Sequence, residues 1–157
     1  MLPGARINKT IIAVAISLIL SKYILHLSGF YMTIAVILSM KSDPHKSYEY
    51  GKNRVIGTLL GGFLGYLIMI IVRHSPIQEE SIFMILINLT CIYLILWFSK
   101  LVHMPEIGTT IGCVVFFSIT LIRFHAPVFE YVSMRVIETL IGVVIATIIN
   151  SIHVNKE

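Results

Sequence analysis

Residues 55–72 read VIGTLLGGFLGYLIMIIV, an unbroken stretch without a charged side chain. A helix that crosses a bilayer needs about 20 predominantly apolar residues, and about 17 can suffice. The stretch is continuous, whereas a strand of a membrane β-barrel would alternate over a shorter segment. It therefore predicts a membrane-spanning helix, with Arg54 directly before it and Arg73 directly after it.

Five other apolar runs flank this stretch, at residues 11–27, 30–40, 81–98, 107–122 and 136–152. The segments between the runs contain proline or glycine pairs that are typical of turns. The chain is 57% hydrophobic and only 13% charged, whereas a soluble domain has about 25% charged residues. We therefore expect an all-α integral membrane protein with six transmembrane helices. Residues 1–157 would form a single membrane domain, with no C-terminal soluble domain.

Motifs of catalysis are missing from the sequence. It contains no nucleophile elbow, no phosphate-binding glycine loop and no metalloprotease helix, so we expect no enzyme activity, catalytic residue or cofactor. Cys91 and Cys113 fall inside apolar runs and are predicted to be packing thiols. The six histidines are scattered singly, so no metal site is expected. The net charge is +4, but the basic residues lie between apolar runs, which indicates membrane topology and not nucleic-acid binding.

The basic residues predict the orientation of the chain. With six crossings and the N-terminus inside, the inside segments hold Arg6, Lys9, Lys41, Lys46, Lys52, Arg54, Lys100 and Lys156. The outside segments hold Arg73, Arg123 and Arg135, with Lys22 near the outer end of the first span. Lysine and arginine are enriched in cytoplasmic segments, so we expect both termini on the cytoplasmic side of the cell (plasma) membrane. A cysteine at Gln78 should then react with an external reagent, and one at Ser47 should not.

An internal repeat is the most informative pattern. Residues 48–61, YEYGKNRVIGTLLG, match residues 129–142, FEYVSMRVIETLIG, at a constant offset of 81. The match includes charged and polar positions, which chance similarity between apolar helices rarely carries. We interpret it as a duplication, with repeat one at about residues 5–73 and repeat two at about 80–152. Each repeat would cross the membrane three times, so the second would be inverted relative to the first, as in many secondary transporters.

Two cations and one carboxylate are candidate functional side chains. Arg54 and Arg135 would open the third and sixth helices, where an arginine either anchors the helix at the headgroups or binds substrate. Glu138 lies one turn inside the sixth run, three residues after Arg135. It either forms an ion pair with that arginine along the helix or is a titratable carboxylate that couples protons to transport.

The second and fifth runs are short or interrupted. Residues 30–40 would rise about 16 Å as a helix, about half of a hydrocarbon core of roughly 30 Å. Matched short or glycine-interrupted segments point to the binding site of a transporter, and their N-terminal ends attract a carboxylate. The alternative is a second span over 27–41 that crosses with local thinning of the bilayer. The predicted substrate-binding residues are Arg54, Arg135, Thr109, Thr110 and Gly29.

Small residues form one face of the third helix and of the sixth. Gly57, Gly61 and Gly65 recur every four residues, and the matching positions of repeat two are Glu138, Gly142 and Ala146. Small residues let helix backbones approach closely in lipid. We expect these positions to pack helices, with the two faces against each other or against another subunit. A glycine-lined permeation path is the alternative.

Three segments resemble the membrane domain of the aromatic-acid exporter family, within the fusaric-acid-resistance-like (FUSC) superfamily: the opening GARINKTIIAVAISLIL (4–20), FYMTIAVILSMKSDPHKSYEYGKNRVIGTLLGGFLGYL (30–67) and the close MRVIETLIGVVIATIIN (134–150). The resemblance implies six helices per module and export of aromatic carboxylic acids. Longer relatives with two fused modules imply that two copies pair.

The combined expectation is a transporter-like membrane protein that exports aromatic or other organic acids. Its partners would be membrane lipids, the small organic-acid substrate and a second copy of the chain or a related module, with no nucleic acid. The alternative is a non-transporting membrane scaffold, or a module that binds lipid or a partner.

Overall fold

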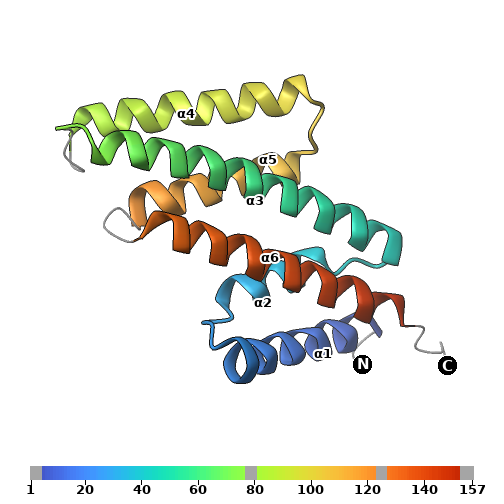
Figure 1. The fold of residues 1–157 in the computed structure, drawn as a ribbon. Coiled ribbons are helices and arrows are strands. Elements are labelled where there is room, and N and C mark those ends of the chain that lie inside the picture. Colours follow the sequence, from blue (N-terminus) through green and yellow to red (C-terminus); the bar gives the residue numbers. More distant parts are fainter. Residues whose placement is uncertain (1–4, 77–80, 123–126, 153–157) are drawn as a thin grey trace. The chain divides into compact units, whose positions relative to one another are not determined.

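The computed structural model describes residues 5–76, 81–122 and 127–152. Within these ranges the chain forms six α-helices and two π-helical segments, and no strand (Figure 1). The elements in chain order are α1 (Ala5–Leu20), η1 (Ser21–Leu25), α2 (Phe30–Ser39), α3 (Pro44–Arg73), α4 (Ile82–Leu101), α5 (Glu106–Phe117), η2 (Ser118–Ile122) and α6 (Val128–Ser151).

Four helices of the described part are long and apolar enough to cross a membrane: Ile7–Leu25, which contains most of α1 and all of η1, and α3, α4 and α6. The two others are shorter, since α2 has 10 residues and the apolar stretch through α5 covers Glu106–Leu121. The predicted all-helical membrane fold is confirmed. The two short helices are those that the sequence singled out.

The starts of α3 and α6 differ from the prediction. Helix α3 begins at Pro44 and α6 at Val128, well before the apolar runs that start at residues 55 and 136. The expectation that Arg54 and Arg135 open these helices is therefore wrong, because the polar residues before each run continue the same helix. Proline is favoured in a first helical turn, so Pro44 begins α3 where the sequence suggested a linker.

The chain divides into two compact units, and each draws on both predicted repeats. Unit 1 contains residues up to Val55 and from Ile137 onward, and unit 2 is Ile56–Val136. Unit 1 thus holds α1, η1, α2, the first part of α3 and the second part of α6. Unit 2 holds the rest of α3, then α4, α5, η2 and the start of α6.

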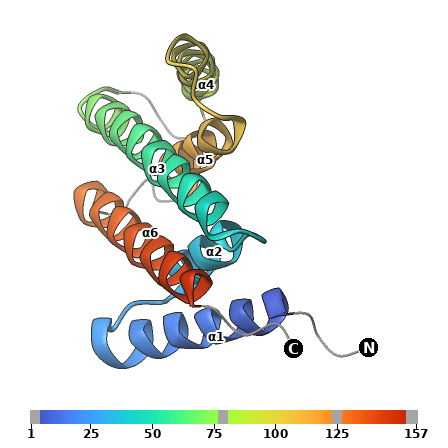
Figure 2. The same ribbon diagram turned by 90° about the vertical axis from the view of Figure 1, so that its right-hand side faces the viewer.

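The core of unit 1 lies where α1, α2 and α6 meet (Figure 2). Its buried side chains are Ala13, Met32, Val36, Met40, Ile145 and Ala146. The hydroxyls of Ser17 and Thr33 are 3.3 Å apart and link α1 to α2. Gly29 precedes α2 with φ +70°, a left-handed conformation that glycine adopts without strain.

Asn150, near the end of α6, joins three segments of unit 1. Its amide nitrogen donates hydrogen bonds to the carbonyl oxygen of Lys41 (3.0 Å) and to the hydroxyl of Ser47 (2.7 Å). The Nζ atom of Lys9 donates to the carbonyl oxygen of Asn150 (3.1 Å). Because Asn150 is buried, these bonds hold the α2–α3 connection and the start of α1 to the end of α6.

In unit 2, α5 packs between α3 and α4. One cluster joins Cys91 and Ile95 of α4 to Phe116 of α5, with Leu60 and Leu64 of α3 against it. A second buried cluster contains Met69, Val72, Met84, Ile111, Val115, Ile119 and Val128. The short helix α5 is thus covered by apolar side chains on two sides.

Candidate functional site

Three charged side chains are buried in the described residues. Arg54 and Arg135 are each 6% exposed, and Glu138 is 3% exposed. Ionisable residues inside membrane helices are expensive to bury and usually functional. Arg54 and Glu138 belong to unit 1, and Arg135 belongs to unit 2.

Arg135 is held against the π-helical turn η2. Its Nη2 atom donates a hydrogen bond to the hydroxyl of Ser118 at 3.2 Å, and that hydroxyl donates to the carbonyl oxygen of Val115 at 2.7 Å. Ser118 is the first residue of η2 and is itself buried. π-helical turns occur frequently at functional sites. This turn and Arg135 place a permanent positive charge and a hydroxyl inside unit 2.

Two further buried polar residues belong to unit 2. Asn88 of α4 is 6% exposed, and its Oδ1 atom has no hydrogen-bond partner among the described residues. The same holds for the hydroxyl of Thr58 on α3, which is 1% exposed. A buried polar atom normally has a partner. The Oδ1 atom of Asn88 can accept a hydrogen bond from a bound molecule or from water, and the hydroxyl of Thr58 can accept or donate one. Asn88 follows Met84 by one turn on the buried face of α4.

The predicted substrate-binding residues lie in separate places. Thr109 and Thr110 are in the first turn of α5, where Thr110 is exposed and the hydroxyl of Thr109 lies 3.5 Å from the carbonyl oxygen of Pro105. Ser118 follows nine residues after Thr109, about 13 Å along a helix axis. The structure therefore brings Arg135 to the end of α5 that is opposite the two threonines. Gly29 lies in unit 1, close to the side chain of Ser21.

Ser118, Asn88 and Thr58 are the residues that the sequence reasoning did not single out. Each is a polar residue inside an apolar run, which is a signal in the sequence. Serine and threonine hydroxyls often bond their own helix backbone, however. The hydroxyl of Ser151 does so with the carbonyl oxygen of Thr147. Only the three-dimensional structure shows that the hydroxyl of Ser118 also accepts a hydrogen bond from Arg135.

The small-residue faces of α3 and α6 each meet a short helix. A Cβ atom at Gly57 or Gly61 would meet the backbone carbonyl oxygens of Gly108 and Gly112 in α5. A Cβ at Gly65 would come within 2.8 Å of Ile119. The sequence left open whether the two faces pack against each other, and the structure gives the face of α3 a different partner, α5.

The corresponding face of α6 packs on α2. A Cβ at Gly142 would lie 2.5 Å from the carbonyl oxygen of Met32 and 2.6 Å from the Cβ of Ala35. Ala146, one turn later, is fully buried in the same core. Close backbone approach is thus the structural role of these small residues.

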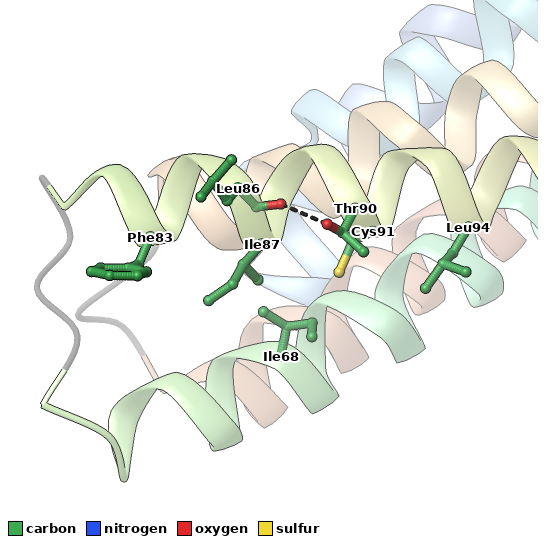
Figure 3. A pocket seen from close by; sticks show the side chains of 7 residues that line it. All are labelled: Ile68, Phe83, Leu86, Ile87, Thr90, Cys91 and Leu94. Atoms are coloured by element: carbon green, nitrogen blue, oxygen red, sulfur yellow. Dashed lines mark hydrogen bonds between the residues drawn. The ribbon is translucent and has the colours of Figure 1, made fainter.

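A groove of about 410 Å³ lies between α3 and α4 in unit 2 (Figure 3). It is lined by Ile68, Phe83, Leu86, Ile87, Thr90, Cys91 and Leu94. The hydroxyl of Thr90 donates to the carbonyl oxygen of Leu86 at 2.8 Å, so it does not donate a hydrogen bond into the groove. The groove therefore suits an apolar chain and not a carboxylate.

Several apolar helices of spanning length, two of which carry buried charged side chains, are typical of a multi-pass helical membrane protein. A family model described as fusaric acid resistance protein-like matches residues 12–149. The chain belongs to this family, and it is a membrane protein of transporter type. No curated protein and no solved structure matches it.

Proposed function

We propose that this protein exports organic acids, aromatic carboxylates above all, across the plasma membrane. The observation that carries the proposal is the buried guanidinium of Arg135, held at Ser118 on a π-helical turn of an apolar bundle. Guanidinium stays protonated and matches a carboxylate with two parallel hydrogen bonds. The same unit also contains the buried hydroxyl of Thr58, which can donate to a carboxylate, and the buried Oδ1 atom of Asn88, which can accept from the hydroxyl of a protonated acid.

The proposal includes two inverted repeats, and equivalent packing contacts support it. Gly61 of α3 lies against Gly112 of α5, and Gly142 of α6, at the matching position 81 residues later, lies against Met32 of α2. In each case the third helix of one repeat packs on the short middle helix of the other. A two-fold relation between the repeats produces this exchange.

Glu138 is the proposed proton-coupling group. It is 3% exposed and replaces the glycine that repeat one has at the equivalent position, Gly57. A buried carboxylate exists in charged and neutral forms that a transport cycle can alternate. We also propose that two copies pair, because one six-helix module has little room to enclose a drug-sized acid, and that the protein has no enzymatic role.

Purified protein in proteoliposomes tests the function. We expect saturable flux of a radiolabelled aromatic acid such as benzoate, and no flux of benzylamine, which has the same ring and the opposite charge. Protein-free liposomes correct for diffusion of the neutral acid. A protein that moves no organic acid under an imposed proton gradient in either direction would instead be the non-transporting module.

Cysteine labelling tests the proposed orientation, with both termini cytoplasmic. Ser47 is fully buried, so the exposed neighbour Lys46 is the better inside position. Gln78 lies outside the described residues, and His74, which is exposed, replaces it. With Cys91 and Cys113 changed to alanine, an impermeant maleimide should label His74→Cys in intact cells and Lys46→Cys only after lysis. The reverse pattern contradicts the orientation.

A further inference from the structure

Two lysines are bound to the buried Asn150 in unit 1, Lys9 of α1 through its ammonium group and Lys41 of the α2–α3 connection through its backbone carbonyl. The ammonium group of Lys9, in α1, is 3.1 Å from the carbonyl oxygen of Asn150. The carbonyl oxygen of Lys41, just after α2, accepts from the side-chain amide of the same asparagine at 3.0 Å. Residues distant in sequence are thus fixed around one point, because each is hydrogen-bonded to Asn150.

The side chain of Lys41 is also held in place. Its Nζ atom lies 4.0 Å from the centre of the Tyr50 ring, a cation–π contact. Lys46 and Lys52 are exposed on the same first part of α3. The acidic residues nearby are Asp43, which is exposed, and Glu49, whose Oε1 atom lies 3.9 Å from Nδ1 of His45. Among the side chains that the structure describes at this end of unit 1, four lysines against two carboxylates leave it positive.

The cluster lies at the level expected for lipid headgroups. Lys9 lies two residues before the apolar run of α1, and the lysines of α3 precede the apolar run that starts at residue 55. Helix α3 has 30 residues, about 45 Å, against a hydrocarbon core of roughly 30 Å. Its polar first part therefore extends beyond the core. Tyr48 and Tyr50 are exposed there, as tyrosines commonly are at membrane interfaces.

Exposed apolar side chains next to Lys9 distinguish a lipid from a free anion. Ile7, Ile11 and Ile12 of α1 are 53%, 61% and 51% exposed. Ile12 lies one turn after Lys9 on the same side of α1, and Ile7 and Ile11 extend the exposed apolar surface around the helix, so acyl chains can pack along α1. A free phosphate would gain nothing from this surface, whereas a phospholipid uses both the charge and the apolar side chains.

We propose that the Asn150-centred end of unit 1 is a binding site for an anionic phospholipid, with Lys9 and Lys41 as the contacts for its phosphate and the isoleucines of α1 as the contacts for its chains. Lys46 and Lys52 contribute to the attraction from the rim. This inference does not depend on the transported substrate, since it concerns a different part of the chain from Arg135 and Ser118.

Native mass spectrometry of the full chain in neutral detergent measures the binding. The probes are dioleoyl phosphatidylglycerol and dioleoyl phosphatidylcholine, which share their chains and phosphate and differ in net charge. We expect the anionic lipid to bind more tightly. Lys9→Gln with Lys41→Gln should weaken its binding about 25-fold, at about five-fold per lysine near the surface, with little change for phosphatidylcholine. The matched control, Lys22→Gln with Lys100→Gln, changes two lysines outside the cluster and should bind as the wild type does.

Two further measurements test the proposal even if the double glutamine variant does not fold. In the wild type, the preference for the anionic lipid should fall as salt rises, because screening weakens exposed charges. Lys9→Arg with Lys41→Arg should retain it. Equal affinity of the wild type for the two lipids overturns the proposal, and so does wild-type binding by a folded glutamine variant. Displacement of the anionic lipid by millimolar inorganic phosphate would show that the site recognises a free anion and would overturn the lipid assignment.

Discussion

Replacing Arg135 by glutamine is expected to lower aromatic-acid flux in proteoliposomes about 10- to 100-fold. A hydrogen bond to a charged group contributes about 1.5–3 kcal/mol, and the buried guanidinium is the proposed carboxylate contact. Glutamine keeps a donor at this position but removes the charge. Ser118→Ala should reduce flux less, because it removes only the hydroxyl that positions Arg135. Initial rates over a range of acid concentrations give the affinity and the turnover separately.

Two further variants show whether a loss of flux is specific to Arg135. Arg73→Gln removes an exposed arginine at the end of α3 and should leave flux unchanged. Thr109→Val with Thr110→Val removes both hydroxyls from the first turn of α5 at nearly constant shape. Loss of flux in the threonine variant with normal flux in Arg135→Gln would move the site to the start of α5. If Arg135→Gln, Arg54→Gln and the threonine variant all transport as the wild type does, the proposed site is wrong.

Gly61→Ala and Gly62→Ala are expected to differ sharply in stability, although the residues are neighbours on α3. A Cβ at Gly61 would meet the backbone of Gly112, which cannot move unless α5 moves with it. A Cβ at Gly62 would lie 3.2 Å from one side-chain methyl of Val132, which can shift. Overpacking of this kind typically destabilises by about 1–3 kcal/mol, whereas alanine in a helix gains up to about 1 kcal/mol over glycine.

Thermal unfolding in detergent, followed by circular dichroism, measures the difference. Gly61→Ala should melt at a clearly lower temperature than the wild type, and Gly62→Ala should melt at the same temperature or slightly above it. The two variants have the same composition and helix propensity, so the comparison isolates the contact with α5. Equal melting temperatures would mean that α3 does not approach α5 closely at Gly61.

The helices and the two short elements could be predicted because apolar length and turn residues determine them directly. The starts of α3 and α6 could not. The polar residues of 44–54 pack within unit 1 through contacts such as that of Gly51 with Val143, and a contact made over such a distance in sequence leaves no periodic pattern. Pro44 is equally compatible with a linker and with a first helical turn.

Part of the candidate site could also be predicted from the sequence. The repeat singled out Arg54 and Arg135, since charged residues matched in register between two apolar segments. Their depth in the helices depended on where those helices begin. The partner of Arg135 depended on the π-helical turn at Ser118, which has no signature of its own. The glycine faces were evident from spacing, but spacing specifies close approach and not which helix approaches.

The discontinuity of unit 1 constrains the order in which the protein can be made. Lys41 and Asn150 are 109 residues apart in the chain, and Lys9 and Asn150 are 141 apart. At about 5–20 residues per second, translation from Lys41 to Asn150 takes roughly 5 to 22 seconds. During that interval α1 and α2 are already synthesised, and the surface of Met32 and Ala35 that receives Gly142 is still uncovered. We therefore expect lipid or an insertion chaperone to cover this surface of α2 until α6 is synthesised.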